Sequence, residues 1–314
     1  MNARDYVYEV YKERSFSIAA KNLYVSQPAL SASVKKIEQE LGITIFDRST
    51  SPISLTEEGK VYIDALEKMK NILSETRVKL SDMNELKTGI IKVSGENFVS
   101  SFILPKIIME FSKKYPGIKV EIIESNSPDL RQLLLNETAD LLIAHDFDKN
   151  LYSCESILEE SLLLAVPENF KENKRLEDYL LTREDIINGK HLSEDCPKIR
   201  LGEFKDVPFV LLKKGNDTRR RADLILDEEG ISLSNVKIYL DQLITSYNME
   251  CFGLGAGIVN DVLVKSSSQK GCVYYKLSGR SAYRTMSIGY KKNRYVSKVM
   301  KAFIETAKEV YKNN

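Results

Sequence analysis

The chain has 314 residues, of which 43% are hydrophobic and 29% are charged, a composition typical of soluble globular proteins. It has no run of about 18 apolar residues, and its charged N-terminal segment MNARDYVYEV lacks an apolar signal core, so we expect no membrane span, no export and a cytoplasmic location. The 46 Lys and Arg residues balance the 45 Asp and Glu residues, so bulk charge does not indicate a nucleic-acid partner.

Cysteine and histidine are too sparse for most metal or catalytic sites. The four cysteines are widely spaced with no CxxC pair, and the two histidines, His145 and His191, are isolated in the sequence. We therefore expect reduced thiols, no metal, no cofactor and no enzymatic activity.

The first patterned segment, FSIAAKNLYVSQPALSASVKKIEQELG, predicts two helices joined by a very short turn. The first helix covers residues 16–24, and the second covers residues 27–41. Ser26 is a good N-cap for the second helix, and Gly42 can end it. Helices joined this tightly must cross at a steep angle, as they do in a helix-turn-helix.

The second helix has one apolar stripe and an opposite face of small, polar and basic residues. The stripe is Leu30, Val34, Ile37 and Leu41. The opposite face and its flanks hold Pro28, Ser31, Ala32, Lys35, Lys36 and Gln39, and Gln27 lies at the N-terminal end between the two faces. A recognition helix needs such a face, because bulky groups would block the major groove, whereas Ser, Gln and Lys can bind bases or phosphates. The alternative is a helical hairpin with a merely solvated outer face.

The next segment, ITIFDRSTSPISLTEEG, predicts a small β-hairpin, or wing, followed by a helix. Two β-prone pieces, residues 43–46 and 53–55, flank a polar turn. Arg48 at the base of the wing can reach a DNA phosphate. Thr56 is placed to cap the following helix, whose first turn carries two glutamates.

Residues 16–59 resemble the winged helix-turn-helix of LysR-type transcriptional regulators, and the similarity extends through the rest of the chain. In that family, the residues that match Ser26, Gln27, Pro28, Ser31 and Lys35 lie at or near the DNA, and the one that matches Arg48 touches the backbone. We add Lys36, on the flank of the same face, to this set. The chain departs from the family at Ala32 and in the wing, where members often carry Arg, so we expect fewer phosphate contacts and a weaker salt dependence.

The segment from residue 57 to about residue 86 predicts one long helix with a heptad seam. The seam residues recur at spacings of 4 and 3 and are Tyr62, Leu66, Met69, Leu73, Thr76, Leu80 and Met83. The spacing favours a dimer, which would place two recognition helices on an interrupted inverted repeat in a promoter. The resemblance implies a dimer of dimers, with RNA polymerase as a further candidate partner. The alternative is an amphipathic helix packed on its own domain.

From Gly89 onward, strands and helices alternate, which predicts an α/β domain with a parallel-rich sheet. In the first lobe we expect strands at 90–94, 119–124 and 140–144 and helices at 102–115 and 128–136. The chain should first cross into a second lobe at 160–170, which then holds a strand, loop and helix at 206–230 and a helix end, glycine turn and strand at 249–264. It should return to the first lobe through 274–277 and 286–290 and end in a helix at 296–311. Residues 171–200 read as a helical insertion plus a loop, with no function assigned.

The predicted fold class is therefore α/β with a helix-rich N-terminal head. It combines a winged helix-turn-helix domain (residues 1–58), a linker and dimerisation helix (residues 59–87) and an effector-binding domain (residues 88–314). The last has two lobes and resembles the LysR effector domain, itself like periplasmic binding proteins.

Ligands of open α/β sheets bind beyond the carboxyl ends of the strands. These ends suggest a set of effector-binding residues between the lobes: Glu96, Phe98, Ser100, Ser101, Asn126, His145, Asp217 and Thr218. The family usually has small hydroxyl side chains after the first strand, so Glu96 and Phe98 suggest a pocket less suited to a bare small anion. The TRRR motif at 218–221 could bind an anion or begin a solvated helix.

We thus predict a sequence-specific transcriptional regulator of LysR type, with a small-molecule effector bound between two lobes. The alternative is a cytoplasmic solute-binding or enzymatic α/β protein with an accessory helix-turn-helix head. The sparse histidines argue against an enzyme, and the expected lack of export argues against a solute-binding protein.

Overall fold

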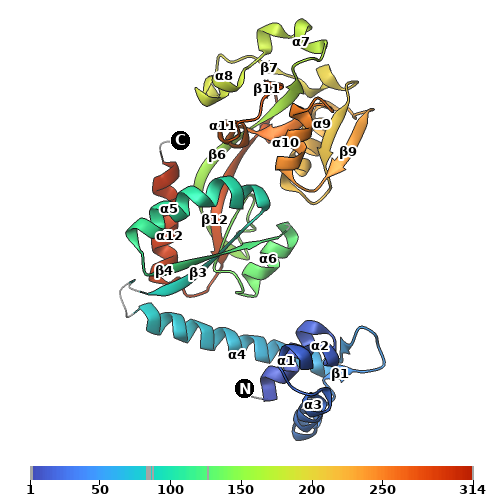
Figure 1. Cartoon of the computed structure of the whole chain (residues 1–314), viewed down its shortest axis with the longest axis vertical. Coiled ribbons are helices and arrows are strands. Elements are labelled where there is room, and N and C mark those ends of the chain that lie inside the picture. Colours follow the sequence, from blue (N-terminus) through green and yellow to red (C-terminus); the bar gives the residue numbers. More distant parts are fainter. Residues whose placement is uncertain (1–2, 83–85, 87, 126, 313–314) are drawn as a thin grey trace. The chain divides into compact units, whose positions relative to one another are not determined.

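The computed structural model describes residues 3–82, 86, 88–125 and 127–312. The chain divides into two compact units, Met1–Leu80 and Ser81–Asn314. The first unit is a helical head with a two-stranded wing (Figure 1). Its elements are α1 (Ala3–Glu13), α2 (Phe16–Asn22), α3 (Gln27–Leu41), β1 (Phe46–Asp47), β2 (Ser54–Leu55) and α4 (Glu57–Asp82).

The core of the head lies between α1, α2 and α3. Ala19 and Ala20 of α2 are buried, and their small side chains allow the helices to cross closely. The predicted stripe of α3 is buried except for Leu41, which ends the helix in solvent. Helix α1 was not among the predicted elements, although its two valines, Val7 and Val10, are fully buried.

The short turn between α2 and α3 is closed by backbone hydrogen bonds. The N–H of Val25 donates to the carbonyl of Ala20 at 3.0 Å, and the N–H of Tyr24 donates to that of Lys21 at 3.2 Å. This is the Schellman pattern, with Tyr24 at the left-handed position (φ 55°). The hydroxyl of Ser26 then caps α3. The chain thus ends one helix and starts the next within four residues.

The wing is shorter than predicted, with two paired residues in each strand. It is anchored where α4 begins, because the N–H of Thr56 donates to the carbonyl of Ile45 at 3.1 Å and the hydroxyl of Thr56 accepts from Gly59 N–H at 2.9 Å. A Cβ atom on Gly59 would lie 2.0 Å from the carbonyl oxygen of Ile45, so only glycine allows this approach.

Helix α4 starts on the head core and continues beyond it. Leu66 is buried in that core and Tyr62 packs against it. The first turns of α4 therefore pack on their own domain, as the alternative to a dimer seam predicted. Farther along, Met69, Leu73 and Leu80 are exposed, and Leu73 is 57% exposed. Met83 lies outside the described residues. The exposed half of the predicted seam is therefore not part of the head core, although the Met69 sulfur accepts a hydrogen bond from Arg4 at 3.5 Å.

The second unit is a two-lobed α/β domain. In lobe I the sheet order is β4–β3–β5–β12–β6. These strands are β3 (Gly89–Gly95), β4 (Ile118–Glu124), β5 (Leu141–Ala144), β6 (Tyr152–Pro167) and β12 (Tyr283–Lys291). The first three are mutually parallel, and β12 runs antiparallel to β5 and β6, so the sheet is mixed.

Helices cover both faces of the lobe I sheet (Figure 1). They are α5 (Leu104–Lys114), α6 (Ser127–Leu135) and α12 (Lys298–Tyr311). Leu141 and Ile143 of β5 join the core cluster that includes α5 and α12, while Leu142 faces the α6 cluster. A strand covered on both faces reads as an unbroken apolar run, which is why β5 was predictable. The helix expected at 102–115 starts earlier, as a π-helical turn, η1 (Val99–Ile103).

Lobe II is built on the second half of β6, which pairs with β10 (Gly257–Asn260) and β11 (Cys272–Leu277). The predicted return through 274–277 is wrong, because β11 pairs inside lobe II; β12 makes the return. The strand predicted at 249–264 also ends early. Asn260 accepts a hydrogen bond from Leu263 N–H at 2.7 Å and caps a short helix, α11 (Asp261–Ser266).

The other elements of lobe II surround this sheet. They are β7 (Lys198–Ile199), η4 (Leu201–Phe204), β8 (Phe209–Leu212), α9 (Asp217–Glu229), β9 (Val236–Leu240), α10 (Leu243–Cys251) and η5 (Arg280–Ala282). The 171–200 segment forms α7 (Glu172–Arg175), η2 (Glu177–Tyr179), α8 (Arg183–Ile187) and η3 (Lys190–Leu192). Its Arg183 donates to the carbonyls of Val264 and Lys265 at 3.1 Å, so the insertion clamps the end of α11.

A carboxyl group is fully buried in α10 of lobe II. Glu250 accepts a hydrogen bond from the Ser246 hydroxyl at 2.9 Å, and its other oxygen has no hydrogen-bond partner in the structure. Burial raises the pKa of Glu250 to about 8, and the bond from Ser246 offsets only part of this rise. The side chain is therefore neutral in the folded protein at pH 7.

We expect Glu250→Gln to remove a pH dependence of stability. The folded-state pKa of Glu250 is raised, so the wild type loses stability as pH rises from about 4.5 to about 8, by an amount on the order of 5 kcal/mol. Urea midpoints at pH 5 and pH 8 should therefore separate for the wild type and converge for Glu250→Gln. The exposed Glu194→Gln is the control. Equal separation in all three proteins would contradict the assignment.

Candidate DNA-binding face and inter-lobe cavity

The predicted DNA-binding residues share the outer face of α3 and its first turn. Most are exposed, and Ser31 is half-buried; the exposed ones are Ser26, Gln27, Pro28, Lys35 and Lys36. Two of them are already bonded, since Ser26 caps the helix and the Gln27 side-chain oxygen accepts from the Ser17 hydroxyl at 3.2 Å. Lys35 makes no hydrogen bond or ion pair to another described residue, so its ammonium group is free for an anionic partner.

Arg48 is held on α3 rather than extended into solvent. Its guanidinium donates to the Ser31 hydroxyl at 3.2 Å, pairs with Glu38 at 3.3 Å and lies over the Phe16 ring. Glu38 was not predicted as part of this site. Its other oxygen accepts from the N–H of Ile45 at 2.8 Å, which fixes the start of the wing against the helix. To bind a DNA phosphate, Arg48 must first break its ion pair with Glu38.

Tyr24 was also missed. It occupies the left-handed position of the turn beside the N-terminus of α3 and is 97% exposed. The sequence signal was a large aromatic residue in the short segment between the two predicted helices. Tyr24 thus offers a hydroxyl and a ring beside the predicted face.

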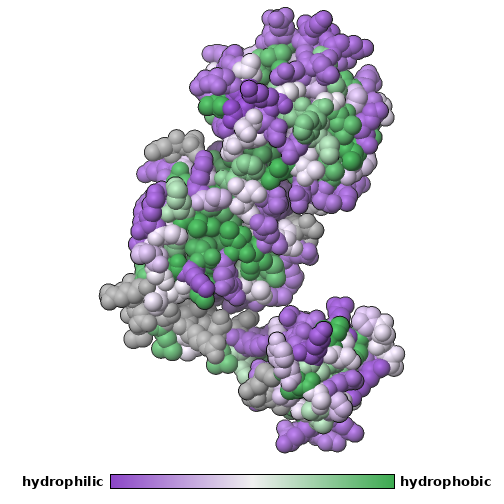
Figure 2. Space-filling view, viewed as in Figure 1, coloured by the Kyte–Doolittle hydropathy of each residue, from purple (hydrophilic) through white to green (hydrophobic). Residues whose placement is uncertain are grey.

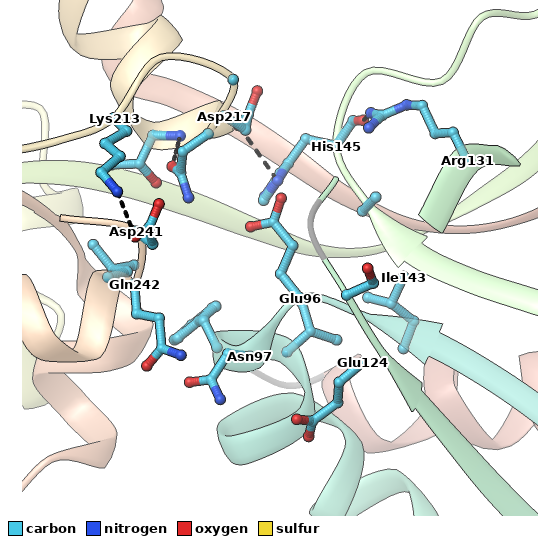
Figure 3. Close-up of a pocket in the computed structure, with 18 of the residues that line it drawn as sticks. Glu96, Asn97, Glu124, Arg131, Ile143, His145, Lys213, Asp217, Asp241 and Gln242 are labelled. Atoms are coloured by element: carbon cyan, nitrogen blue, oxygen red, sulfur yellow. Dashed lines mark hydrogen bonds and ion pairs between the residues drawn. The ribbon is translucent and has the colours of Figure 1, made fainter. Parts of the chain in front are cut away.

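The second unit contains a cavity of about 390 Å³ between the lobes (Figure 3). Loops after β3, β4 and β5 line it from lobe I, and the segments that precede α9 and α10 line it from lobe II. Five predicted effector residues contribute to its wall: Glu96, Phe98, His145, Asp217 and Thr218.

The remaining predicted effector residues do not line it. Ser100 and Ser101 are absent from the wall, so the expectation that their hydroxyls face the cavity is wrong. The π-helical turn η1 buries Ser100, whose hydroxyl has no hydrogen-bond partner in the structure, and leaves Ser101 exposed. Asn126 lies outside the described residues.

Four buried or half-buried ionisable side chains meet where β6 and β12 cross between the lobes. This hinge network consists of His145, Glu160, Asp217 and Arg284. Arg284 and Glu160 are direct partners in the β12–β6 ladder, and the Arg284 Nε donates to Glu160 at 2.8 Å. Another nitrogen of Arg284 donates to Asp217, at the start of α9, at 2.7 Å. His145 lies 2.7 Å from Glu160 and 3.4 Å from Asp217.

The hinge network keeps its carboxylates ionised despite their burial. Burial raises the pKa of Asp217, but the charges of Arg284 and His145 outweigh it and hold the value at about 2. For Glu160, burial again raises the pKa, and Arg284 and His145 lower it by more. Arg284 was not predicted at all, and its third contact, with the Thr218 hydroxyl at 3.2 Å, engages that hydroxyl inside the protein.

The TRRR motif supplies a second link between the lobes. Arg220 and Arg221 of α9 both pair with Asp146, which follows β5 in lobe I; the Arg221 contact is 2.9 Å. Neither alternative for the motif, an anion site or a solvated helix start, describes these two arginines, because Asp146 of the other lobe pairs with both and Asp217 pairs with Arg220 at 2.6 Å.

Within the described ranges, no group of three or more His, Cys, Asp or Glu side chains is arranged to hold a metal ion. Among the helices that can be described, none has both the length and the apolar character needed to cross a membrane.

Two family models match nearly the whole chain. Residues 1–60 match "Bacterial regulatory helix-turn-helix protein, lysR family", and residues 84–312 match the "LysR substrate binding domain". The chain belongs to the LysR family of transcriptional regulators. The head described above is therefore the family's DNA-binding domain, and the two-lobed unit is its substrate-binding domain, as the resemblance implied.

Related LysR regulators align along the whole chain. An uncharacterized HTH-type transcriptional regulator, YcgK, of Bacillus subtilis (strain 168) is 28% identical over 315 residues, covering 98% of this chain and 94% of that protein. A probable RuBisCO transcriptional regulator of Phaeodactylum tricornutum is 25% identical over 310 residues, covering 96% and 94%.

Solved structures share the fold of this LysR regulator. Full-length CbnR in complex with its target DNA superposes with a TM-score of 0.62 at 18% identity, covering 98% of each chain. The regulatory domain of CcmR from Synechocystis PCC6803, in complex with 2-PG, superposes with a TM-score of 0.58 at 17% identity, covering 72% of this chain and 99% of that domain. The predicted fold class is confirmed.

Proposed function

We propose that this LysR regulator binds an interrupted inverted repeat in promoter DNA as a dimer, with α3 of each head in the major groove. The observation that carries the proposal is the outer face of α3, where small side chains leave Lys35 and Ser31 accessible beside the exposed turn. Small residues allow the helix to enter the groove, and Lys35 can reach a phosphate or a guanine. Ser26 and Gln27 position the helix start.

Arg48 has a second role in this proposal. A DNA phosphate that approaches the wing competes with Glu38 for the guanidinium, since both partners are anionic acceptors. Release of Arg48 also frees the Ser31 hydroxyl for a base edge. Lys36 has only a 3.9 Å ion pair with Glu40 on the helix surface and is free to turn toward the backbone.

Two apolar surfaces support self-association. The exposed Met69, Leu73 and Leu80 on α4 have the heptad spacing of a two-helix seam. On lobe I, Figure 2 shows hydrophobic residues gathered over β3, β4 and α5, where Ile90, Met109 and Ile122 are exposed. We assign the first surface to the dimer and the second to a dimer of dimers, with RNA polymerase as a later partner on the promoter.

The effector site is the cavity between the lobes. A small molecule that contacts both lobes favours one degree of closure over another, and this difference in affinity is what couples the site to DNA binding. We propose no catalytic step. Both histidines of the chain are bound to carboxylates, His145 to Glu160 and His191 to Asp261 at 3.1 Å, so neither is presented as a general base.

We expect Ser31→Ala and Lys35→Ala each to weaken operator binding by about 1–3 kcal/mol, the value of a good base contact. Lys35→Ala should also reduce the slope of log affinity against log salt by about 1 if the lysine contacts a phosphate. The measurement is fluorescence anisotropy, over a range of salt concentrations, on DNA from upstream of the protein's own gene and of the adjacent divergent gene.

Lys174→Ala, on the exposed surface of α7 in the other unit, is the matched control and should leave the affinity unchanged. Full affinity in both α3 variants at moderate salt would show that α3 presents another face to DNA. No sequence-specific binding by the wild type to any promoter fragment would contradict the proposed function itself.

A further inference from the structure

The effector cavity has four Lys and Arg side chains in its wall, and the protein pairs two of them with carboxylates. Arg284 is 2% exposed and pairs with Glu160 and Asp217. Lys213 pairs with Asp241 at 2.7 Å, and Arg131 donates to the carbonyl of His145 at 2.9 Å. A carboxylate or phosphate ligand would therefore have to break an ion pair inside the protein before it met Arg284 or Lys213.

Two carboxylates of lobe I also line the cavity. Glu96 directly follows β3 and Glu124 is the last residue of the adjacent parallel strand β4, so both lie at the same edge of the sheet. Figure 3 shows Glu96 extending from its loop toward the middle of the cavity, near His145. Glu124 makes no hydrogen bond or ion pair to another described residue. Two acids at one wall repel an anion and attract a cation.

Neighbouring groups extend this preference. The side-chain amides of Asn97, which follows Glu96 in lobe I, and of Gln242, which precedes α10 in lobe II, also line the cavity and can accept further N–H groups (Figure 3). On the lobe II side, Lys214 lines the cavity, is exposed and forms no ion pair with a described residue. The wall thus combines an acidic side in lobe I with one available ammonium group in lobe II.

We propose that the effector carries protonated amino groups, for which Glu96 and Glu124 are separate acceptors at the lobe I wall. This inference rests on the proposed effector site and specifies its ligand class. The cavity volume of about 390 Å³ suits a small organic amine. A simple diamine and an amino acid share this chemistry; an amino acid would in addition direct its carboxylate toward Lys214.

The test measures binding to the full-length regulator by calorimetry at constant ionic strength. The probes are 1,4-diaminobutane and L-lysine as amines, glutarate as a dianion and 1,4-butanediol as a neutral analogue. We expect binding of at least one amine and none of the other two. Glu96→Gln should weaken amine binding tenfold or more, and Glu124→Gln severalfold. Lys214→Ala should weaken L-lysine but not 1,4-diaminobutane, which separates the two sources.

Glu121→Gln is the matched control, because it lies on β4 three residues before Glu124 and outside the cavity wall. The inference is overturned if neither amine binds, if glutarate or the diol binds as well as the amines, or if Glu96→Gln binds amines like the wild type. Operator anisotropy with the same probes separates the two proposals. Glutarate that binds and shifts operator affinity would overturn the amine and support the effector site.

Discussion

Arg284→Met is expected to lower the free energy of unfolding of the two-lobed unit by about 3–5 kcal/mol, the cost of breaking a buried ion pair by removing one partner. In the wild type, Arg284 pairs with the carboxylates of Glu160 and Asp217. The substitution leaves both carboxylates in place without this partner. Methionine fills much of the volume of the arginine stem, so the loss reports the missing charge rather than a cavity. Urea unfolding of the full chain, followed by circular dichroism, measures it.

Arg280→Met is the control for Arg284→Met. It removes an exposed arginine four residues away, on η5, and should change stability by less than about 0.5 kcal/mol. The double variant Arg284→Met with Glu160→Gln should recover part of the loss, because one unpaired charge is gone. A cost below about 1 kcal/mol for Arg284→Met would show that the hinge network does not hold the lobes together.

The hinge network also affects the pH below which this unit unfolds. The folded-state pKa of Asp217 is depressed to about 2, so its stabilising effect is present above its ordinary pKa of 3.8 and is lost as pH falls toward 2. Without Arg284, the folded-state pKa of Asp217 should rise. Acid titrations should therefore show Arg284→Met unfolding at a higher pH than the wild type.

Leu73→Asp is expected to separate the dimer and to reduce operator affinity by orders of magnitude. The leucine is 57% exposed in the single chain and lies at a heptad position between Met69 and Leu80. If α4 pairs with its copy, the aspartate would place a charge in a buried layer in each helix, facing its equivalent. A monomer presents only one head to an inverted repeat and loses the gain from simultaneous binding.

Sedimentation velocity measures the oligomeric state, and anisotropy on the operator measures the affinity. Lys68→Asp, on the same helix but off the seam and exposed, should leave both unchanged. Unchanged sedimentation of Leu73→Asp would assign this stripe to contacts within one chain.

The elements of the head were largely predictable from sequence. Ser26 caps α3 and Gly42 ends it in the left-handed conformation, as expected. Its stripe of Leu30, Val34 and Ile37 is buried. Each of these features depends on residues within about four positions along the chain, which is the range of a helical turn and its caps. The alternation of strands and helices in lobe I follows from equally local patterns.

The cavity was predictable only in outline. Strand ends located Glu96 and His145 correctly, because the carboxyl ends of parallel strands meet at one edge. The orientation of Ser100 and Ser101 was not predictable, because it depends on the π-helical form of η1, which has no distinctive residue signal here. The sequence also did not predict which lobe contains β11, because the residues of a strand do not specify which strands pair with it.

The sequence by itself determined α3 with its caps and the alternation of strands and helices, which are carried by local periodicity and turn residues, and its resemblance to LysR regulators implied the family and the two-lobed plan. The tertiary structure alone decided which charges meet. Arg284 finds Glu160 through the β12–β6 ladder, and Arg220 finds Asp146 across the lobes. The physical reason is that ion pairing depends on distance in space and on burial, and residues more than 70 positions apart acquire both only when the sheet has formed.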